Sequence, residues 1–209
     1  MVIISPAGDI NDEMNQQPVV FLDRDGTLNV EVGYIRNLED LVLIDGAADA
    51  VRKLNEAGVA TILVTNQTGA ARGYYPESHI LDLNARLLKL LKAGGARLDD
   101  VYYCPHFADG IVAPFSRLCE CRKPSVGMVK KAYADHPQLD STRSFVIGDK
   151  ATDIELAKNC GAKGVLVTTG YGTAVLKGEY QWTVEPDFQA SSIVEAVDWI
   201  LQQVHPELS

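Results

Sequence analysis

The chain has 209 residues, 46% of them apolar and 22% charged, and this length suits a single domain with a core of its own. Its 19 basic and 28 acidic residues give a formal charge of -9, which argues against nucleic acid or an anionic membrane as the partner. No apolar run reaches the roughly 20 residues of a membrane span, and the first residues lack the pattern of a secretory signal, so we expect a soluble, cytoplasmic protein.

The first half of the chain alternates between the patterns of strands and helices. Residues 1–17 are polar and lean acidic, so we expect a flexible tail ahead of a single domain over residues 18–209. Continuous apolar runs predict buried strands over residues 19–22 and 59–64. Helices are predicted over residues 46–56 and from Pro76 to the residue before Gly94, the second with an apolar stripe of Ile80, Leu83, Leu87, Leu88 and Leu91.

The second half continues this alternation. Strands are predicted over residues 101–103, 144–147, 164–168 and 182–184, and helices over 127–134, 150–159 and, after a capping box of Ser192 and Glu195, up to Gln203. Strands that alternate with helices form right-handed βαβ units around a parallel sheet. We therefore expect a doubly wound α/β domain with a mostly parallel sheet and helices on both faces. In such domains ligands bind beyond the carboxyl ends of the strands.

Polar residues stand at several of these strand ends. Asp23 and Asp25 follow the first strand, and two neighbouring carboxylates are costly to bury. Thr65 follows the second strand, Asp149 follows the strand over 144–147, and Lys123 precedes a helix. Each of these three also has a simpler interpretation, as a turn residue, a helix N-cap and a solvated charge, respectively. Because the carboxyl ends of parallel strands converge on one crevice, their combination indicates a shared site.

Such a crevice supports phosphoryl transfer. Carboxylate oxygens suit Mg²⁺, which neutralises charge on a phosphate. One carboxylate in line with phosphorus attacks it to form an aspartyl phosphate, and a second protonates the leaving alkoxide and then activates water. A hydroxyl and a lysine stabilise the equatorial oxygens of the phosphoryl group.

Four segments resemble, in order, the motifs of the haloacid dehalogenase (HAD) superfamily: Asp23–Leu28, Thr65–Asn66, Lys123, and Gly148–Asp149 with Asp153. The resemblance covers about residues 18–170. It implies that Asp23 is the nucleophile and Asp25 the general acid and base. It also implies that Thr65 and Lys123 hold the phosphoryl group.

The same resemblance implies a magnesium site. Its ligands would be Asp23, the backbone carbonyl of Asp25, and Asp149. Asp153 matches the second acid of the last motif and is expected to support the site rather than to bind the metal directly.

Residues 104–121 form a candidate zinc-binding loop insertion. The thiols and the imidazole come in two pairs twelve residues apart: Cys104 with His106, and Cys119 with Cys121. Four such ligands suit a structural, tetrahedral Zn²⁺ site. Two unrelated clusters, or a redox-active pair of Cys119 and Cys121, are the alternatives. A metal-bound loop would lead straight into Arg122 and Lys123 and aim both cations at the phosphate site.

Residues 103–106 and 119–124 narrow the resemblance to a branch without a large cap domain, which holds D-glycero-D-manno-heptose 1,7-bisphosphate 7-phosphatases and histidinol-phosphate phosphatases. Residues 29–34 and 65–73 resemble the heptose bisphosphate phosphatases more than the histidinol-phosphate phosphatases. One residue departs from the family pattern, which commonly has proline at the position of Val126. The resemblance implies removal of the 7-phosphate from a heptose bisphosphate, in carbohydrate metabolism such as lipopolysaccharide biosynthesis. It implies substrate contacts by Glu31, Val32, Gly33, Tyr34, Thr65, Asn66, Gln67, Thr68, Arg122, Lys123 and Lys150.

Two other functions are compatible with these residues. Hydrolysis of histidinol phosphate would use the same motifs. A receiver-like module that is phosphorylated on an aspartate also places acids at strand ends, but it needs neither a second carboxylate for the leaving group nor a zinc loop. For the assembly we expect a monomer, because no apolar surface helix stands out in the sequence.

Overall fold

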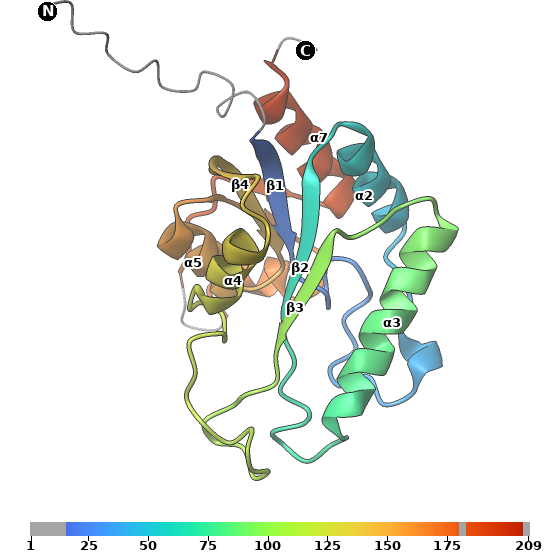
Figure 1. Ribbon diagram of the computed structural model, residues 1–209, viewed down its shortest axis with the longest axis vertical. Coiled ribbons are helices and arrows are strands. Elements are labelled where there is room, and N and C mark those ends of the chain that lie inside the picture. Colours follow the sequence, from blue (N-terminus) through green and yellow to red (C-terminus); the bar gives the residue numbers. More distant parts are fainter. Residues whose placement is uncertain (1–15, 180–182, 207–209) are drawn as a thin grey trace, which may run out of the picture.

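The computed structural model describes residues 16–179 and 183–206, and a six-stranded parallel sheet forms its centre (Figure 1). The strands lie in the order β3-β2-β1-β4-β5-β6, the order of a doubly wound sheet. The predicted α/β class and parallel sheet are therefore confirmed. The strands are β1 Gln17–Leu22, β2 Ala60–Asn66, β3 Asp100–Cys104, β4 Leu139–Gly148, β5 Lys163–Val167 and β6 Phe188–Ala190.

Helices cover both faces of this sheet, with α2, α3 and α7 on one side and α4 and α5 on the other (Figure 1). Between β1 and β2 the chain forms only η1 and α2, so no cap domain is inserted there. None of the helices in the described part of the chain has the length and apolar character needed to span a membrane. The helices are η1 Leu38–Asp40, α2 Ala47–Glu56, α3 Glu77–Ala93, α4 Gly127–Asp135, α5 Ala151–Cys160, α6 Gly172–Leu176 and α7 Ile193–Val204.

The side chains of β1 alternate between two hydrophobic cores, which explains its continuous apolar sequence. Val20 and Leu22 pack in the core beneath α2, α3 and α7, whereas Val19 and Phe21 pack in the core beneath α4 and α5. Successive residues of a strand point to opposite faces, so a strand covered on both sides is apolar throughout. All four side chains are fully buried. This central strand is therefore a rigid support for the residues that follow it.

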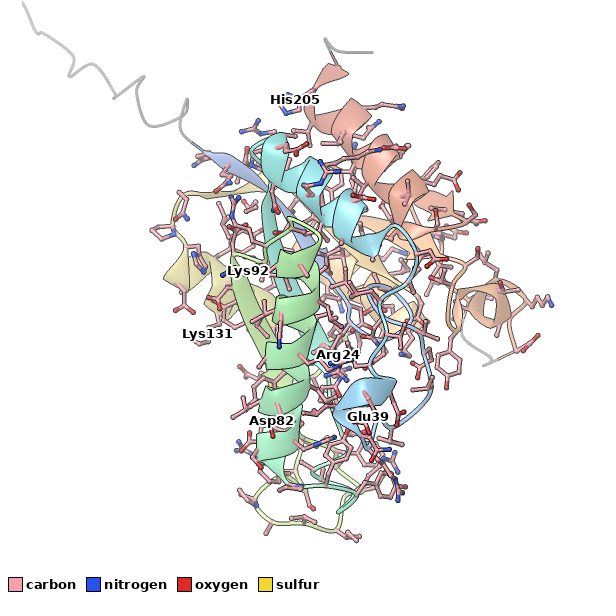
Figure 2. All side chains as sticks on the ribbon, turned by 90° about the vertical axis from the view of Figure 1, so that its right-hand side faces the viewer. Arg24, Glu39, Asp82, Lys92, Lys131 and His205 are labelled. Carbon is pink, nitrogen blue, oxygen red and sulfur yellow. The ribbon has the colours of Figure 1, made fainter. Side chains whose placement is uncertain are left out.

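Helix α3 runs along one side of the sheet and separates a buried face from a solvent face. Asp82 and Lys92 extend outward from it, while Arg24 lies on its inner side (Figure 2). Leu88, predicted to belong to the buried stripe, is instead 38% exposed, because its position turns away from the sheet. Pro76 is the N-cap of α3 and precedes its first residue.

Other differences from the prediction concern short elements. Thr183 and Val184 do not form the strand predicted over residues 182–184, and residue 182 lies outside the described residues. The sixth strand is β6, which pairs with β5 through Val165 and Phe188. Most of the predicted tail also lies outside the described residues, and its last residue, Gln17, belongs to β1. In the predicted capping box, the Ser192 hydroxyl accepts from the Glu195 N–H as expected.

The register of the central strands brings three chain segments to one edge of the sheet. Leu22, the last residue of β1, lies opposite Leu63 of β2 on one side and Ile147 of β4 on the other. The residues that follow these three positions therefore emerge together. Because the strand order changes direction between β2 and β4, this edge is the switch point at which ligands of doubly wound sheets bind.

Candidate active site

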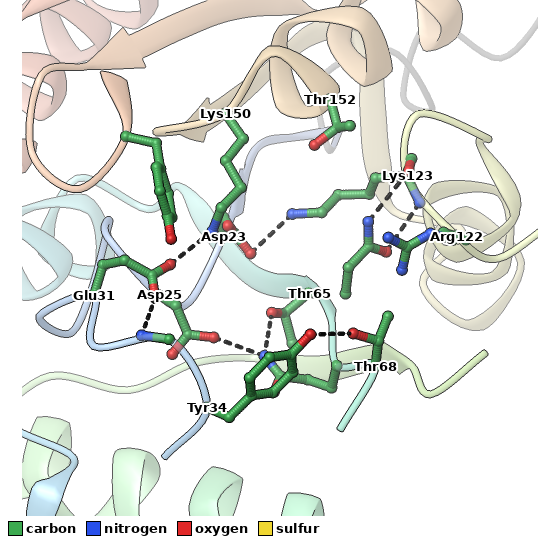
Figure 3. A pocket seen from close by; sticks show the side chains of 14 residues that line it. Asp23, Asp25, Glu31, Tyr34, Thr65, Thr68, Arg122, Lys123, Lys150 and Thr152 are labelled. Atoms are coloured by element: carbon green, nitrogen blue, oxygen red, sulfur yellow. Dashed lines mark hydrogen bonds and ion pairs between the residues drawn. The ribbon is translucent and has the colours of Figure 1, made fainter. Parts of the chain in front are cut away.

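A pocket of about 270 Å³ lies at this edge, and the residues predicted for the phosphate site surround it (Figure 3). Asp23 and Asp25 come from the end of β1, and Thr65 from β2. Lys123 precedes α4. The structure thus brings together residues that are separated by up to about half the chain. The pocket is lined by Asp23, Asp25, Glu31, Gly33, Tyr34, Thr65, Asn66, Gln67, Thr68, Arg122, Lys123, Lys150, Thr152 and Tyr171.

Asp23 is held as an ionised carboxylate at the floor of the pocket. Its oxygen Oδ1 lies 2.8 Å from Nζ of Lys123, and its backbone N–H donates to the carbonyl of Ile147 at 2.9 Å. Burial opposes ionisation of the carboxyl, but the charges of Lys123 and then Lys150 outweigh burial, so the pKa of Asp23 lies below its ordinary value. A buried carboxylate that keeps its charge is the form that acts as a nucleophile.

Lys123 is fixed both at its backbone and at its charged end. Asn66, at the end of β2, accepts from the Lys123 N–H at 3.0 Å and donates to the Lys123 carbonyl at 3.2 Å. The Lys123 ammonium lies between Asp23 and Asp153, 2.6 Å from Oδ1 of Asp153. Burial opposes the charge, but Asp153 and Asp23 raise the pKa of Lys123 above its ordinary value. The cation is therefore stabilised in its charged form beside the Asp23 carboxylate.

Asp25 lies in a set of donors that we call the Asp25 cradle, formed by Arg24, Asn29 and Gln67. The Arg24 guanidinium donates to both carboxylate oxygens, with its Nη2 atom 3.0 Å from Oδ2. Asn29 Nδ2 donates to Oδ1 at 3.0 Å, and Gln67 Nε2 donates to Oδ2 at 2.8 Å. All of these side chains are buried. Both oxygens of Asp25 are consequently satisfied by the protein.

A second group of acids lies next to Asp23 and offers the ligands of a hard cation. One carboxylate oxygen from each of Asp23, Asp149 and Asp153 lies within 4.8 Å of the others. Oδ2 of Asp149 accepts from the Tyr171 N–H at 2.8 Å, while its Oδ1 is buried without a hydrogen bond. Burial is the main cause that raises the pKa of Asp149 to about 8, and the nearby Asp23 and Asp153 add to it against Lys150. A divalent cation would satisfy this oxygen and offset the charge, so the residues fit Mg²⁺.

Asp153 is engaged differently from Asp149. Its Oδ1 forms the ion pair with Lys123, and its Oδ2 accepts from the Lys150 N–H at 3.0 Å at the start of α5. With both oxygens occupied, it orients Lys123 and the first turn of the helix. Lys150, rather than Asp149, is the N-cap of α5.

The segment after β1 forms one wall of the pocket. Glu31 Oε2 lies 2.9 Å from Lys150 Nζ, and Glu31 Oε1 accepts from the Gly33 N–H at 2.6 Å. The Tyr34 hydroxyl lies 3.2 Å from Oγ1 of Thr68, which connects this wall to the segment after β2 (Figure 3). Val32 was predicted to contact substrate but does not line the pocket. Its side chain points to solvent, with 55% of the residue exposed.

Three residues of the site were not predicted from the sequence. Thr152 and Tyr171 line the pocket, and Arg24 lies beneath it. Tyr171 follows β5, which had no recognised motif at its end, so the sequence offered no signal for it. Arg24 did have a signal, since a long cation between two aspartates at the end of a buried strand needs buried acceptors.

The four predicted zinc ligands meet at one point beside the pocket. The three sulfur–sulfur distances among Cys104, Cys119 and Cys121 lie between 3.1 and 3.5 Å. His106 Nδ1 lies 3.3 Å from Cys121 Sγ and 3.7 Å from Cys104 Sγ. These distances are comparable with the edges of roughly 3.5–3.8 Å of a tetrahedron around Zn²⁺. The four cysteines of the chain form no disulfide, so the cluster has the donors and the shape for a zinc ion.

Arg122 follows the cluster directly and reaches the pocket from it. Its Nη1 atom donates to the His106 carbonyl at 3.4 Å, and its guanidinium lies 5.4 Å from the ring centre of Phe107. The guanidinium of Arg72 also lies over this ring, 4.0 Å from its centre. The loop thus positions a second cation near Lys123.

The chain is similar to phosphatases of known substrate. A family model described as HAD-hydrolase-like matches residues 120–196. A D-glycero-D-manno-heptose-1,7-bisphosphate 7-phosphatase from Thermosynechococcus vestitus is 50% identical over 194 residues, which cover 91% of this chain and 98% of that protein. A D-glycero-beta-D-manno-heptose-1,7-bisphosphate 7-phosphatase from Yersinia pestis is 47% identical, covering 73% of this chain and 81% of its own.

The fold is also similar to those of solved phosphatase structures. The D,D-heptose 1,7-bisphosphate phosphatase from B. bronchiseptica, complexed with magnesium and phosphate, superposes with a TM-score of 0.77 at 25% identity, covering 90% of this chain and 99% of that one. A HAD-like phosphatase from Mesorhizobium loti gives a TM-score of 0.76 at 32% identity and covers 91% of this chain and 87% of its own.

Proposed function

The chain belongs to the family of HAD-like heptose bisphosphate 7-phosphatases, and from this premise we propose that it removes the 7-phosphate of D-glycero-D-manno-heptose 1,7-bisphosphate. One observation carries the proposal: in a chain with a net charge of -9, Arg122, Lys123 and Lys150 all line one small pocket with Asp23 at its floor. Cations gathered around a nucleophilic carboxylate serve to bind and attack a phosphate ester.

The reaction takes two steps on this chain. An oxygen of Asp23 bonds to phosphorus while the bond from phosphorus to the sugar oxygen breaks, and protonated Asp25 gives its proton to that leaving oxygen. Water then bonds to phosphorus and loses a proton to the Asp25 carboxylate, while the bond between phosphorus and Asp23 breaks. Inorganic phosphate leaves and both aspartates return to their starting forms. Thr65 and Lys123 hold the phosphoryl oxygens in both steps.

Two metals belong to the proposal. Asp23, Asp149 and the backbone carbonyl of Asp25 would hold Mg²⁺, which supplies positive charge beside the phosphoryl group. The Asp149 oxygen Oδ1, which is buried without a hydrogen bond and lies 3.5 Å from the Lys150 ammonium, supports this assignment. Cys104, His106, Cys119 and Cys121 would hold a structural Zn²⁺, whose role is to fix the loop that carries Arg122.

The rest of the pocket suits a sugar with a second phosphate. A guanidinium binds phosphate with two parallel hydrogen bonds, which makes Arg122 the natural partner of the 1-phosphate. Glu31 and the hydroxyls of Tyr34 and Thr68 face the same space and suit sugar hydroxyls. Lys150 is shared between Glu31 and Asp149 and adds a third cation.

The test is a comparison of phosphate release from heptose 1,7-bisphosphate, heptose 7-phosphate and histidinol phosphate. We expect the highest kcat/KM with the bisphosphate, and a product that retains the 1-phosphate by phosphorus NMR. Faster turnover of histidinol phosphate would assign the chain to the other branch of the superfamily. A stable phosphoprotein without turnover would instead identify a receiver-like module.

A further inference from the structure

Gln67 was predicted to contact the substrate, but the hydrogen-bonding groups of its side chain are all paired with other residues of the protein. Its Nε2 atom donates to Oδ2 of Asp25 at 2.8 Å and to Oγ1 of Thr65 at 3.0 Å, and its Oε1 accepts from Arg24 Nη2 at 2.8 Å. Only 4% of the residue is exposed. An amide has two donors and one acceptor group, so all of its groups already have partners. Gln67 therefore lines the pocket with a side-chain amide that is already engaged in connecting Asp25 to Thr65.

Arg24 is a deeply buried part of the same network. It is 1% exposed, donates to both oxygens of Asp25, and is anchored from α3 by Asn84, whose Oδ1 accepts from Nη1 at 3.2 Å. The side chain is confined between a strand end and a helix, so the guanidinium has little freedom to move. A planar guanidinium with two anchored partners also fixes the plane of the carboxylate that it binds.

We infer that Arg24 and Gln67 are positioning residues that hold Asp25 for the hydrolysis of the aspartyl phosphate. Every contact of the Asp25 cradle is a donor to one of the two carboxylate oxygens, so the cradle fixes both the position and the plane of this carboxylate beside the reaction centre. The carboxylate is thereby fixed for the second step, in which it accepts a proton from the attacking water. The inference rests on the proposed role of Asp25 as acid and base.

The second step can be isolated with p-nitrophenyl phosphate, because p-nitrophenolate leaves without needing a proton. Formation of the aspartyl phosphate then bypasses the acid role of Asp25, whereas its hydrolysis still depends on the base. If the cradle is damaged, we expect a burst of p-nitrophenol equal to the enzyme concentration, followed by slow turnover. A defect that merely unfolds part of the enzyme would lower the steady-state rate in proportion to the folded fraction and would produce no burst.

Two variants test the cradle and one controls for burial. Gln67→Leu removes the amide at similar size, and Arg24→Lys keeps the charge but not the two-oxygen geometry. For both we expect kcat to fall by about 10- to 100-fold together with the burst, and KM to fall with it, because kcat/KM reports only the formation of the aspartyl phosphate. Thr61→Val removes a fully buried, hydrogen-bonded hydroxyl from the opposite end of β2 and should show wild-type kinetics without a burst.

The inference is overturned if both variants keep wild-type kcat, or if Gln67→Leu raises KM at unchanged kcat, since Gln67 would then bind substrate. If Gln67→Leu does not fold, Arg24→Lys decides alone, by the presence or absence of the burst. Failure of the wild type to act on heptose bisphosphate would reject the proposed substrate. It would leave the p-nitrophenyl phosphate test of the cradle unaffected.

Discussion

The Lys123 ammonium lies 2.8 Å from a carboxylate oxygen of Asp23, and the side chains of both residues are almost completely buried. The same ammonium is shared with Asp153, so one cation balances two buried acids. Removal of one partner from a buried ion pair leaves an uncompensated charge that the protein interior cannot solvate.

We therefore predict that Lys123→Met lowers the free energy of unfolding by about 3–5 kcal/mol, measured by urea denaturation. Lys131→Met is the matched control, because Lys131 pairs with Asp135 on the surface of α4 and is 64% exposed at its side chain. The control should change stability by less than about 1 kcal/mol. Equal losses in the two variants would contradict the importance of the buried pair.

Asp149 gives the metal-free protein a specific pH dependence. Its pKa is raised from 3.8 to about 8, chiefly by burial, so between these values the native chain holds a proton that the unfolded chain has lost. The folded state binds more protons in this window, and its stability accordingly falls as the pH rises towards 8. Mg²⁺ competes with this proton for Asp149. The increase in melting temperature on adding Mg²⁺ should therefore be larger at about pH 8.5 than at about pH 6.

Asp149→Asn is the control for this effect, since it cannot ionise and is a poor magnesium ligand. In this variant the gain from Mg²⁺ should be small at both pH values. If Mg²⁺ raises the melting temperature of the wild type equally at both pH values, Asp149 is not a ligand that must lose its proton to bind the metal.

The cysteine cluster predicts that the purified protein contains about one zinc per chain by elemental analysis. Cys119→Ser should lose most of this zinc and lower the melting temperature, because the ion is expected to hold the loop in place. Cys160→Ser is the matched control, since the Cys160 thiol donates to the Ala157 carbonyl and lies outside the cluster. A zinc-free preparation with full stability and activity would argue for one of the alternatives, a redox-active pair or unrelated thiols.

Gly26 and Gly33 give a matched test of close packing at the site. Both have a positive φ, 82° and 78°, a backbone conformation that residues with a side chain rarely adopt. A Cβ atom on Gly26 would collide with the Asp149 carboxylate, whereas one on Gly33 would meet no atom within 4 Å. Gly26→Ala should thus destabilise the protein by clearly more than the roughly 1 kcal/mol expected for Gly33→Ala, and it should weaken Mg²⁺ binding as well. Similar losses in both would mean that backbone strain alone accounts for them.

The fold and the positions of the main acids could be predicted because both follow from local patterns. The apolar run 19–22 predicts a strand covered on two faces, and this was confirmed. Parallel strands then bring their carboxyl ends together whatever the loops do, so Asp23, Thr65 and Asp149 were expected to meet. Their catalytic roles stay predictions, since position alone does not measure reactivity.

Short elements and side-chain directions could not be predicted in the same way. Strand β6 has only three residues, too few for a periodic pattern, and its pairing with β5 depends on the rest of the sheet. The sequence places Gln67 beside Thr65 but does not say whether its amide points to substrate or to Asp25. Val32 was likewise included because the resemblance covers Glu31–Tyr34 as one segment, and a resemblance does not show which side chains of a segment face the pocket.

The two hydrogen bonds between Asn66 and the backbone of Lys123 hold this lysine in place independently of the loop that precedes it. Cys104 fixes the loop at the end of β3 and Asn66 fixes its exit, while Ile111 and Leu118 near its tip are more than 80% exposed. Exposed side chains of this loop can therefore change in composition without displacing the ammonium. Divergence among related chains at this tip is a poor guide to divergence in their chemistry.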